Sequence, residues 1–264
     1  MSVGKPTLWQ IQVSHYSEKA RWALDYKGID HVRRTPIPGT HIPIALWLTR
    51  GEGITFPVLQ LGGRTIGDST AIVAALEDLR PDPPLYPADP AQRARALELE
   101  DFFDEELGPY ARLLAFHELI GDPEVFAELA SRTVPPPLSK MKGLTGAYAR
   151  ALTSLRYGAQ RDEAAAEARE KVLAALDRLE AELAASGGEY LAGERFGVAD
   201  LTAAALFYPV VGPVEGPLPP DAPVPAAIEA FREGISDRPG FVWVEEMFRR
   251  HRTPRSAAVP SIGR

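Results

Sequence analysis

The first 80 residues alternate short apolar runs typical of strands with amphipathic runs typical of helices. The runs that predict strands are Thr7–Val13, Asp30–Ile37, Phe56–Leu61 and Arg64–Ile66. The last two flank Gly62 and Gly63, so we expect a hairpin with a glycine turn. The runs Ser17–Lys27 and Ser69–Leu79 predict helices, with Ser69 at the cap position of the second. The predicted order is strand, helix, strand, loop, hairpin and helix.

Beyond residue 90 the pattern is helical. The main predicted helices are Ala91–Ile120, Glu163–Ser186, Phe196–Val211, Ala226–Ile235 and Phe241–Arg250. We expect Gly108-Pro109 to kink the first of them, because proline lacks the N–H that a continuous helix needs. The preceding segment, PDPPLYPADP at residues 81–90, holds five prolines and is predicted to be an extended linker.

Composition narrows the possible chemistry. The chain has 264 residues, of which 45% are hydrophobic and 25% charged, which is typical of a folded globular protein. It contains no cysteine, which excludes disulfides, thiolate nucleophiles and cysteine zinc sites. The five histidines show no metal-ligand spacing, so we expect no metal ion.

Charge and hydropathy bear on the compartment and the partners. The 36 acidic residues outnumber the 29 basic ones, which argues against a nucleic-acid binder, because such proteins cluster lysine and arginine. No signal-peptide pattern is evident at the start, and the most apolar stretch, Leu201–Val211, is too short to span a bilayer. We expect a cytoplasmic protein with no nucleic-acid or membrane partner.

Four segments, in this order, resemble the glutathione S-transferase family, nearest to its zeta and omega classes. They are SHYSEKARWALDYKGID at 14–30, FPVLQLGGRTIGDST at 56–70, LYPADPAQRA at 85–94 and YLAGERFGVADLTAAAL at 190–206. The resemblance implies an α/β plus all-α architecture and a homodimer. The implied parts are a thioredoxin-like domain at 1–80, the linker at 81–90, an all-helical C-terminal domain at 91–253 and a tail at 254–264.

The resemblance implies that the hydroxyl of Ser14 donates a hydrogen bond to the sulfur of glutathione, the expected co-substrate. The position suits that role, because the unpaired N–H groups and the dipole at a helix N-terminus stabilise an anion. Ser14 could also simply cap the helix, although Ser17 is the stronger candidate for the cap. Tyr16 is a rival hydroxyl donor or part of the pocket wall.

Further contacts to glutathione are implied around the hairpin. Pro57 is expected to follow a cis peptide bond, which would leave the backbone of Val58 free to pair with the cysteinyl part of the ligand. Ser69 and the first N–H groups of its helix would hold the γ-glutamyl carboxylate, and Asp68 would attract the ammonium group.

The remaining predictions concern the loop after the second strand, the co-substrate pocket and three neighbouring side chains. His41 and Ile42, in that loop, are candidates for contacting the glycyl carboxylate. The residues expected to line a pocket for an apolar small-molecule electrophile are Tyr16, Phe103, Tyr110 and Tyr208. His15 is expected to be exposed, Arg21 to pair with a carboxylate of the helical part, and Asp200 to cap its helix through the N–H of Gly197.

We therefore predict a glutathione transferase that activates the thiol of its ligand, since serine stands at both positions of the family's Cys-x-x-Cys motif. One alternative is a glutathione-dependent isomerase, dehalogenase or ether-cleaving enzyme that uses the same thiol site. Another is a non-catalytic glutathione-transferase-like binding protein, an alternative that the altered loop Thr49–Gly53 and the insertion Val134–Leu138 leave open.

Overall fold

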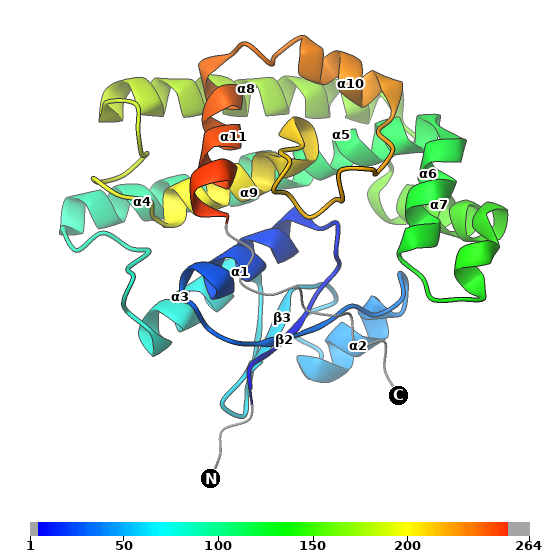
Figure 1. Ribbon diagram of the computed structural model, residues 1–264, viewed down its shortest axis with the longest axis horizontal. Coiled ribbons are helices and arrows are strands. Elements are labelled where there is room, and N and C mark those ends of the chain that lie inside the picture. The colour runs from blue at the N-terminus through cyan, green and yellow to red at the C-terminus, as the bar shows by residue number, and fades with distance from the viewer. Residues whose placement is uncertain (1–4, 253–264) are drawn as a thin grey trace.

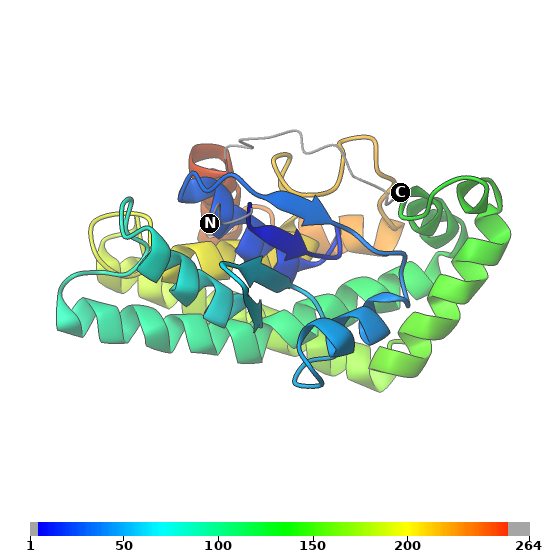
Figure 2. The same cartoon turned by 90° about the horizontal axis from the view of Figure 1, so that it is seen from below.

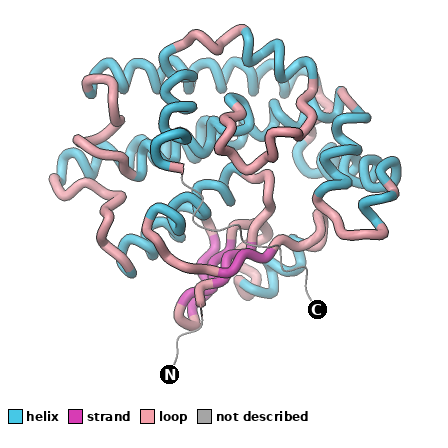
Figure 3. The backbone as a smooth tube through the Cα atoms, in the orientation of Figure 1, coloured by secondary structure: helices cyan, strands magenta, loops and turns pink. Residues whose placement is uncertain are grey.

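The computed structural model describes residues 5–252, so the predicted tail at 254–264 lies outside the described residues. A four-stranded sheet with its helices forms the N-terminal part, and the remainder is helical (Figure 1, Figure 3). The strands are β1(Thr7–Trp9), β2(Val32–Arg34), β3(Val58–Leu61) and β4(Arg64–Gly67), in the spatial order β2-β1-β3-β4. β1 and β2 are parallel, whereas β3 is antiparallel to β1 and β4. The predicted combination of an α/β part and an all-α part is confirmed.

Helices α1(His15–Tyr26) and α3(Ser69–Leu79) pack against each other, and α3 also contacts β3 and β4. Leu8 of β1, Leu59 of β3 and Leu24 of α1 are fully buried in one cluster. Alternating strand residues and helix residues three or four apart supply this core, because those spacings place side chains on one face.

Helix α2(His41–Leu48) occupies a stretch that was predicted to be a loop. Its sequence, HIPIALWL, is apolar on every side and so lacks the polar face that marks a surface helix. Ala45 and Leu48 are buried near Val58, whereas Trp47 is 75% exposed. The loop expectation was wrong because an unbroken apolar run does not indicate which side a neighbour will cover.

The helical part surrounds a central buried helix. Its members are α4(Pro90–Phe102), α5(Gly108–Gly121), α6(Pro123–Arg132), α7(Lys142–Tyr157), α8(Asp162–Ser186), α9(Val198–Val211), α10(Ala226–Glu233) and α11(Pro239–His251), with short turns η1(Phe103–Leu107) and η2(Leu138–Lys140). α9 packs against α1, α4, α5 and α11, while α6 and α7 lie side by side at one end of the molecule (Figure 2). At the start of α9 the carboxylate of Asp200 accepts a hydrogen bond from the N–H of Gly197 at 2.8 Å, as expected.

A π-helical turn, η1, interrupts the predicted helix Ala91–Ile120 close to the expected break. The N–H of Gly108 donates to the carbonyl oxygen of Phe103, five residues back. In that register Asp104 would receive the next bond, but the following residue is Pro109, which has no N–H. The carbonyl oxygen of Asp104 is therefore left for another donor.

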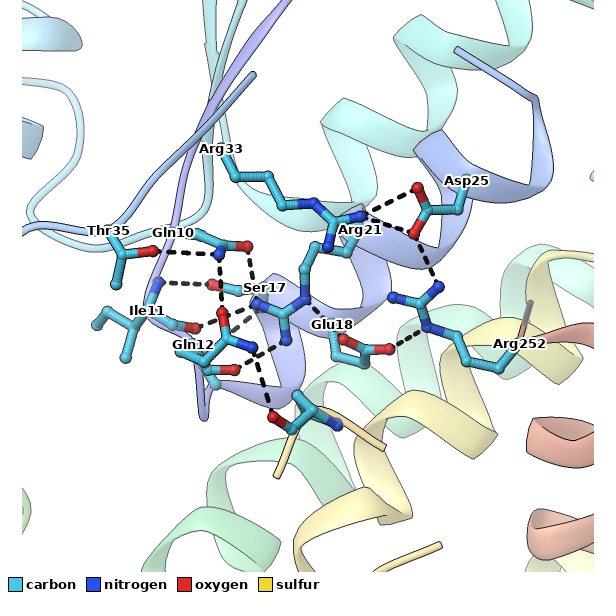
Figure 4. Close-up of polar contacts among 12 residues, drawn as sticks. Gln10, Ile11, Gln12, Ser17, Glu18, Arg21, Asp25, Arg33, Thr35 and Arg252 are labelled. Carbon is cyan, nitrogen blue, oxygen red and sulfur yellow. Dashed lines mark hydrogen bonds and ion pairs between the residues drawn. The ribbon is translucent and has the colours of Figure 1, made fainter. Parts of the chain in front are cut away.

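Buried ion pairs join α1 to the end of the chain's helical part (Figure 4). Arg252, which follows α11, pairs with Glu18 and lies 2.8 Å from a carboxylate oxygen of Asp25. Arg21 pairs with Glu18 at 2.7 Å, so the expectation that Arg21 itself reaches the helical part was wrong. Burial would raise the pKa of Glu18, but the two guanidinium groups outweigh burial and lower it.

A second buried ion cluster joins α1 to α4. The ammonium group of Lys19 lies 2.9 Å from a carboxylate oxygen of Glu100 and 2.6 Å from one of Asp104, and neither Lys19 nor Glu100 exposes its side chain. Lys19 also donates to the hydroxyl of Thr70 at 2.8 Å. The first half of α1 is thus bound to α3 and to the helical part by one cation.

Substituting Arg252 by glutamine should lower the free energy of unfolding by about 3 kcal/mol, because Glu18 and Asp25 would keep buried charge with one partner fewer. Urea unfolding of the variant beside the parent protein measures this loss. The matched control is Arg250→Gln, which breaks a solvent-exposed pair with Glu246 and should have little effect. Equal losses in the two variants would contradict a structural role for the buried network.

Candidate functional site

A cavity of about 1540 Å³ opens between the N-terminal part and the helical part. The predicted site residues that line it are Ser14, Tyr16, His41, Pro57, Asp68, Ser69 and Tyr208. They come from the β1–α1 turn, the start of α2, the segment before β3, the start of α3, and α9. Residues that are far apart in the chain therefore line one cavity, and concave sites of this kind are where proteins bind small ligands.

Four other predicted site residues do not line this cavity. Phe103 is fully buried in the core, with its ring centroid 6.1 Å from that of Phe207. Val58 lies in register with β1 on one side and β4 on the other. Ile42 and Tyr110 are half-buried on helices whose cavity-facing positions belong to other residues. Phe103 belongs to the core rather than to a pocket wall, because sequence spacing does not indicate which face of an element a neighbour covers. The ligand contacts expected of Val58, Ile42 and Tyr110 stay predictions.

Ser14 is the residue that caps α1. Its hydroxyl oxygen accepts a hydrogen bond from the N–H of Ser17 at 3.3 Å, and the helix begins at His15. The helix cap is therefore Ser14 and not Ser17, where it was expected. The hydroxyl oxygen of Ser17 instead accepts a hydrogen bond from the N–H of Ile11 at 3.2 Å. Within residues 5–252 the Ser14 hydroxyl donates to no acceptor, so its proton is available to a ligand.

The Tyr16 hydroxyl is engaged in the protein itself. It donates to the carbonyl oxygen of Asp104 at 2.8 Å, which supplies the bond that Pro109 cannot make. A Cβ atom added at Gly108 would lie 2.2 Å from this hydroxyl, so only glycine permits the contact. Burial is the main reason that the pKa of Tyr16 rises above its ordinary range. Of the two rival donors, Ser14 is the one with a proton to offer.

His15 is buried rather than exposed as predicted, with 3% of its surface accessible. Its Nε2 lies 2.9 Å from the carbonyl oxygen of Gly108, and because a carbonyl only accepts, Nε2 carries the proton. Burial, aided by the nearby charge of Arg112, lowers the pKa of His15 to about 3. His15 is therefore neutral at physiological pH and ties the start of α1 to α5.

The cis peptide bond predicted between Phe56 and Pro57 is confirmed. Asp68 has a φ of 71°, a conformation uncommon for any residue but glycine. One of its carboxylate oxygens accepts from the N–H groups of Thr70 and Ala71, so Asp68 rather than Ser69 caps α3. The capping carboxylate leaves Ser69 at the first helical position, where it lines the cavity and its hydroxyl has no partner among the described residues.

Arg21 holds the turn that carries Ser14 (Figure 4). Its guanidinium donates to the side-chain oxygen of Gln10 at 2.8 Å and to the carbonyl oxygen of Gln12 at 2.9 Å. Gln12 in turn donates to the carbonyl oxygen of Pro217, on the rim of the cavity, at 3.4 Å. The buried ion network is thereby connected to the geometry of the site.

The sequence reasoning missed all five arginines that line the cavity, which are Arg34, Arg112, Arg132, Arg156 and Arg232. Arg112 lies on α5 and Arg156 on α7, and both contribute to the wall of the cavity. No motif marks them, because each is one charged residue on an amphipathic helix. Only the packing of α5, α7 and the N-terminal part brings them to the same space as Ser14.

The described residues supply no metal site of the usual kind. Within residues 5–252 no group of three or more histidine or carboxylate side chains could hold a metal ion. Over the same range no helix combines the length and the apolarity needed to cross a bilayer.

Two family models match the chain. Residues 8–84 match the glutathione S-transferase N-terminal domain, and residues 129–239 match the glutathione S-transferase C-terminal domain. Among curated proteins, maleylacetoacetate isomerase of Rattus norvegicus is 33% identical over 124 residues, which are 43% of this chain and 54% of that protein. The chain thus matches about half the length of such curated relatives.

Solved structures match over nearly the whole chain. FzlA from C. crescentus is 25% identical, with a TM-score of 0.55 over 91% of this chain and 92% of that one. The beta-etherase LigF from Sphingobium sp. strain SYK-6 is 21% identical, with a TM-score of 0.58 over 94% of this chain and 100% of that one, a likeness of fold. The two-part architecture is therefore shared with proteins of diverse names.

The neutral, buried His15 predicts an acid-side loss of stability. Above pH 6.5 the residue is neutral in both the folded and unfolded states, so it contributes no pH dependence. Below pH 6.5 His15 of the unfolded chain binds a proton, whereas His15 of the folded protein stays neutral down to about pH 3. The free energy of unfolding should therefore fall by up to about 1.4 kcal/mol for each unit that the pH is lowered. Urea unfolding between pH 7.5 and 4.5 should show this slope.

The matched variant is His15→Gln, whose amide can still donate to Gly108 but does not titrate. Its unfolding free energy should fall less steeply below pH 6 than that of the parent. Parallel pH profiles for the two proteins would show that folding does not lower the pKa of His15.

Proposed function

Because the chain belongs to the glutathione S-transferase family, we propose that it binds glutathione in the cavity and presents the thiolate to an apolar electrophile. The observation that carries the proposal is the gathering of Ser14, Pro57, Asp68 and Ser69 around one space. These are the positions at which the family resemblance implies the thiol-activating hydroxyl, the cis-proline and the γ-glutamyl contacts.

Ser14 would act as a hydrogen-bond donor to the sulfur. Its oxygen already accepts from the N–H of Ser17, which orients the hydroxyl, and its proton has no acceptor among the described residues. A donated bond stabilises the thiolate more than the thiol, so the thiol pKa falls from its free value of about 8.5. The N-terminus of α1 adds the favourable end of the helix dipole.

The start of α3 would hold the γ-glutamyl end of glutathione. Ser69 offers a hydroxyl and a backbone N–H at the first helical position, both suited to a carboxylate. Asp68 uses one carboxylate oxygen to cap the helix, and the other remains for the ligand's ammonium group. His41, at the start of α2, is placed in the same lining and could meet the glycyl end.

An isomerase that uses the same site is the second candidate, favoured by the relatives named maleylacetoacetate isomerase at 32–33% identity. In an isomerase the thiolate would add to a carbon of the substrate and leave again, so glutathione would be regenerated. Counting the thiol before and after turnover separates the two: a transferase consumes one glutathione for each product, whereas an isomerase consumes none.

We also propose that the protein is a cytoplasmic homodimer, as the family resemblance implies. Sedimentation velocity at micromolar concentration should then give a single species of twice the monomer mass. A monomer at every concentration tested would contradict the dimer.

Substituting Ser14 by alanine should raise the pKa of the bound glutathione thiol by about one to two units, because one hydrogen bond to a charged sulfur is lost. The ultraviolet absorbance of the thiolate, followed against pH in the complex, measures the shift. The value of kcat/KM for a thiol-reactive aromatic electrophile should fall by roughly 10- to 100-fold.

Three variants serve as controls for Ser14→Ala. Ser14→Thr keeps both the cap and the hydroxyl and should retain a low thiol pKa. Ser17→Ala and Tyr16→Phe remove hydroxyls that the protein itself engages, so either protein should keep the thiol pKa of the parent even where its stability falls. A normal thiol pKa in Ser14→Ala together with a raised one in Tyr16→Phe would transfer the role to Tyr16.

A further inference from the structure

Two guanidinium groups share one tyrosine ring in the wall of the cavity away from α3. The guanidinium carbon of Arg112, on α5, lies 4.6 Å from the ring centroid of Tyr157. That of Arg156, on α7, lies 5.5 Å from the same centroid, and its Nε donates to the Tyr157 hydroxyl at 3.1 Å. The two positive groups are therefore within about 10 Å of each other.

Neither guanidinium has an anionic partner within residues 5–252. No carboxylate oxygen of the described residues lies within 4.0 Å of Arg112 or Arg156. By contrast, Arg132, which also lines the cavity, pairs with Glu128 and Asp221 at 3.1 and 3.0 Å. Arg232, another lining residue, donates to the carbonyl oxygen of Val210.

Aromatic rings hold the two cations where they are. The ring of Tyr157 stacks on Phe116 at a centroid distance of 5.3 Å and an interplanar angle of 23°. Arg112 also faces the ring of Tyr16 at 5.9 Å, so it lies between two tyrosines. Ring faces attract cations but leave the N–H groups at the guanidinium edges free to donate to an anion.

From this arrangement we propose that Arg112 and Arg156 form an anion subsite that binds the carboxylate of an otherwise apolar electrophile. The inference rests on the proposed function and specifies its substrate class. Neither guanidinium has a carboxylate of the described residues beside it, and a ligand carboxylate that reached their N–H groups would accept charge-assisted hydrogen bonds and compensate positive charge. The stacked rings of Phe116 and Tyr157 supply an apolar surface for the body of the same molecule.

The position of the subsite separates it from the γ-glutamyl end of glutathione. The γ-glutamyl contacts proposed above lie at the start of α3, whereas Arg112 and Arg156 lie on α5 and α7 of the helical part. Arg112 faces the ring of Tyr16, two residues after Ser14, and both Arg112 and Ser14 line the cavity, so an anion held by Arg112 would share that space with the proposed thiol.

The test compares an aromatic chloride that carries a carboxylate with its methyl ester, both activated by a nitro group. Each rate is divided by the uncatalysed rate with glutathione, because the ester is intrinsically more reactive. In Arg112→Gln and in Arg156→Gln, kcat/KM for the chloronitrobenzoate should fall by roughly tenfold or more, while the value for the ester changes by less than about twofold. Arg112→Lys should retain part of the preference, because it keeps the charge.

The matched control is Arg150→Gln, on α7 but outside the cavity lining, which should leave both values unchanged. An equal loss for acid and ester in the two variants would overturn the subsite. So would a weaker binding of glutathione with an unchanged ratio of acid to ester, since the arginines would then hold the glycyl carboxylate.

A binding measurement separates failure of the subsite from failure of the proposed function. Calorimetric titration of nitrobenzoate and of nitrobenzamide into the full-length protein without glutathione needs no turnover. Nitrobenzoate should bind at least tenfold more tightly than the amide, and Arg112→Gln should abolish the difference. Such a preference without any turnover would refute the transferase and retain the anion subsite, whereas equal binding of the two probes would refute the subsite.

Discussion

The first two side chains of helix α1, His15 and Tyr16, form hydrogen bonds with two carbonyl oxygens of the helical part. The geometry of the candidate site depends on these two bonds. The π-turn η1 and Pro109 leave the carbonyl of Asp104 without a helical donor, and the hydroxyl of Tyr16 supplies the bond. His15 makes the neighbouring bond to Gly108. A buried carbonyl without a donor is costly, so these two side chains have strong reason to stay where they are. Ser14 directly precedes them, and its position relative to both parts of the molecule follows from theirs.

Electrostatics divides the interior into two kinds of region. Where α1 meets the helical part, Lys19 and Arg252 each face buried carboxylates, so charge is compensated on the spot. Around the cavity, Arg112 and Arg156 face aromatic rings, and no carboxylate of the described part of the chain lies within 4.0 Å of either. A half-buried cation without a partner is poorly compensated, so a ligand with a negative charge would gain most at this wall of the cavity. The same fold thus places compensated ion pairs, which hold α1, beside a cavity wall with uncompensated positive charge.

Much of the architecture was predictable because it follows from local patterns. The mixed sheet, the hairpin and the helices from α8 onward follow from periodicity and turn residues, and the cis bond before Pro57 was expected from the family resemblance. The misses have physical reasons. Helix α2 is apolar on all sides, η1 depends on a hydrogen-bond register, and the caps at Ser14 and Asp68 rather than Ser17 and Ser69 differ by only a residue or a turn. Propensity barely distinguishes such neighbouring alternatives.

The sequence by itself determined the two-part plan, the absence of a cysteine nucleophile and the segments from which a thiol-binding site would be drawn. These depend on composition and on contacts between near neighbours, which a linear pattern records. Tertiary structure decided which hydroxyl keeps a free proton, which aromatic residues belong to the core, and that two arginines from α5 and α7 share the ring of Tyr157. Those outcomes depend on which groups from distant parts of the chain form hydrogen bonds and ring contacts with one another. The spacing of side chains within one helix or strand does not indicate such contacts.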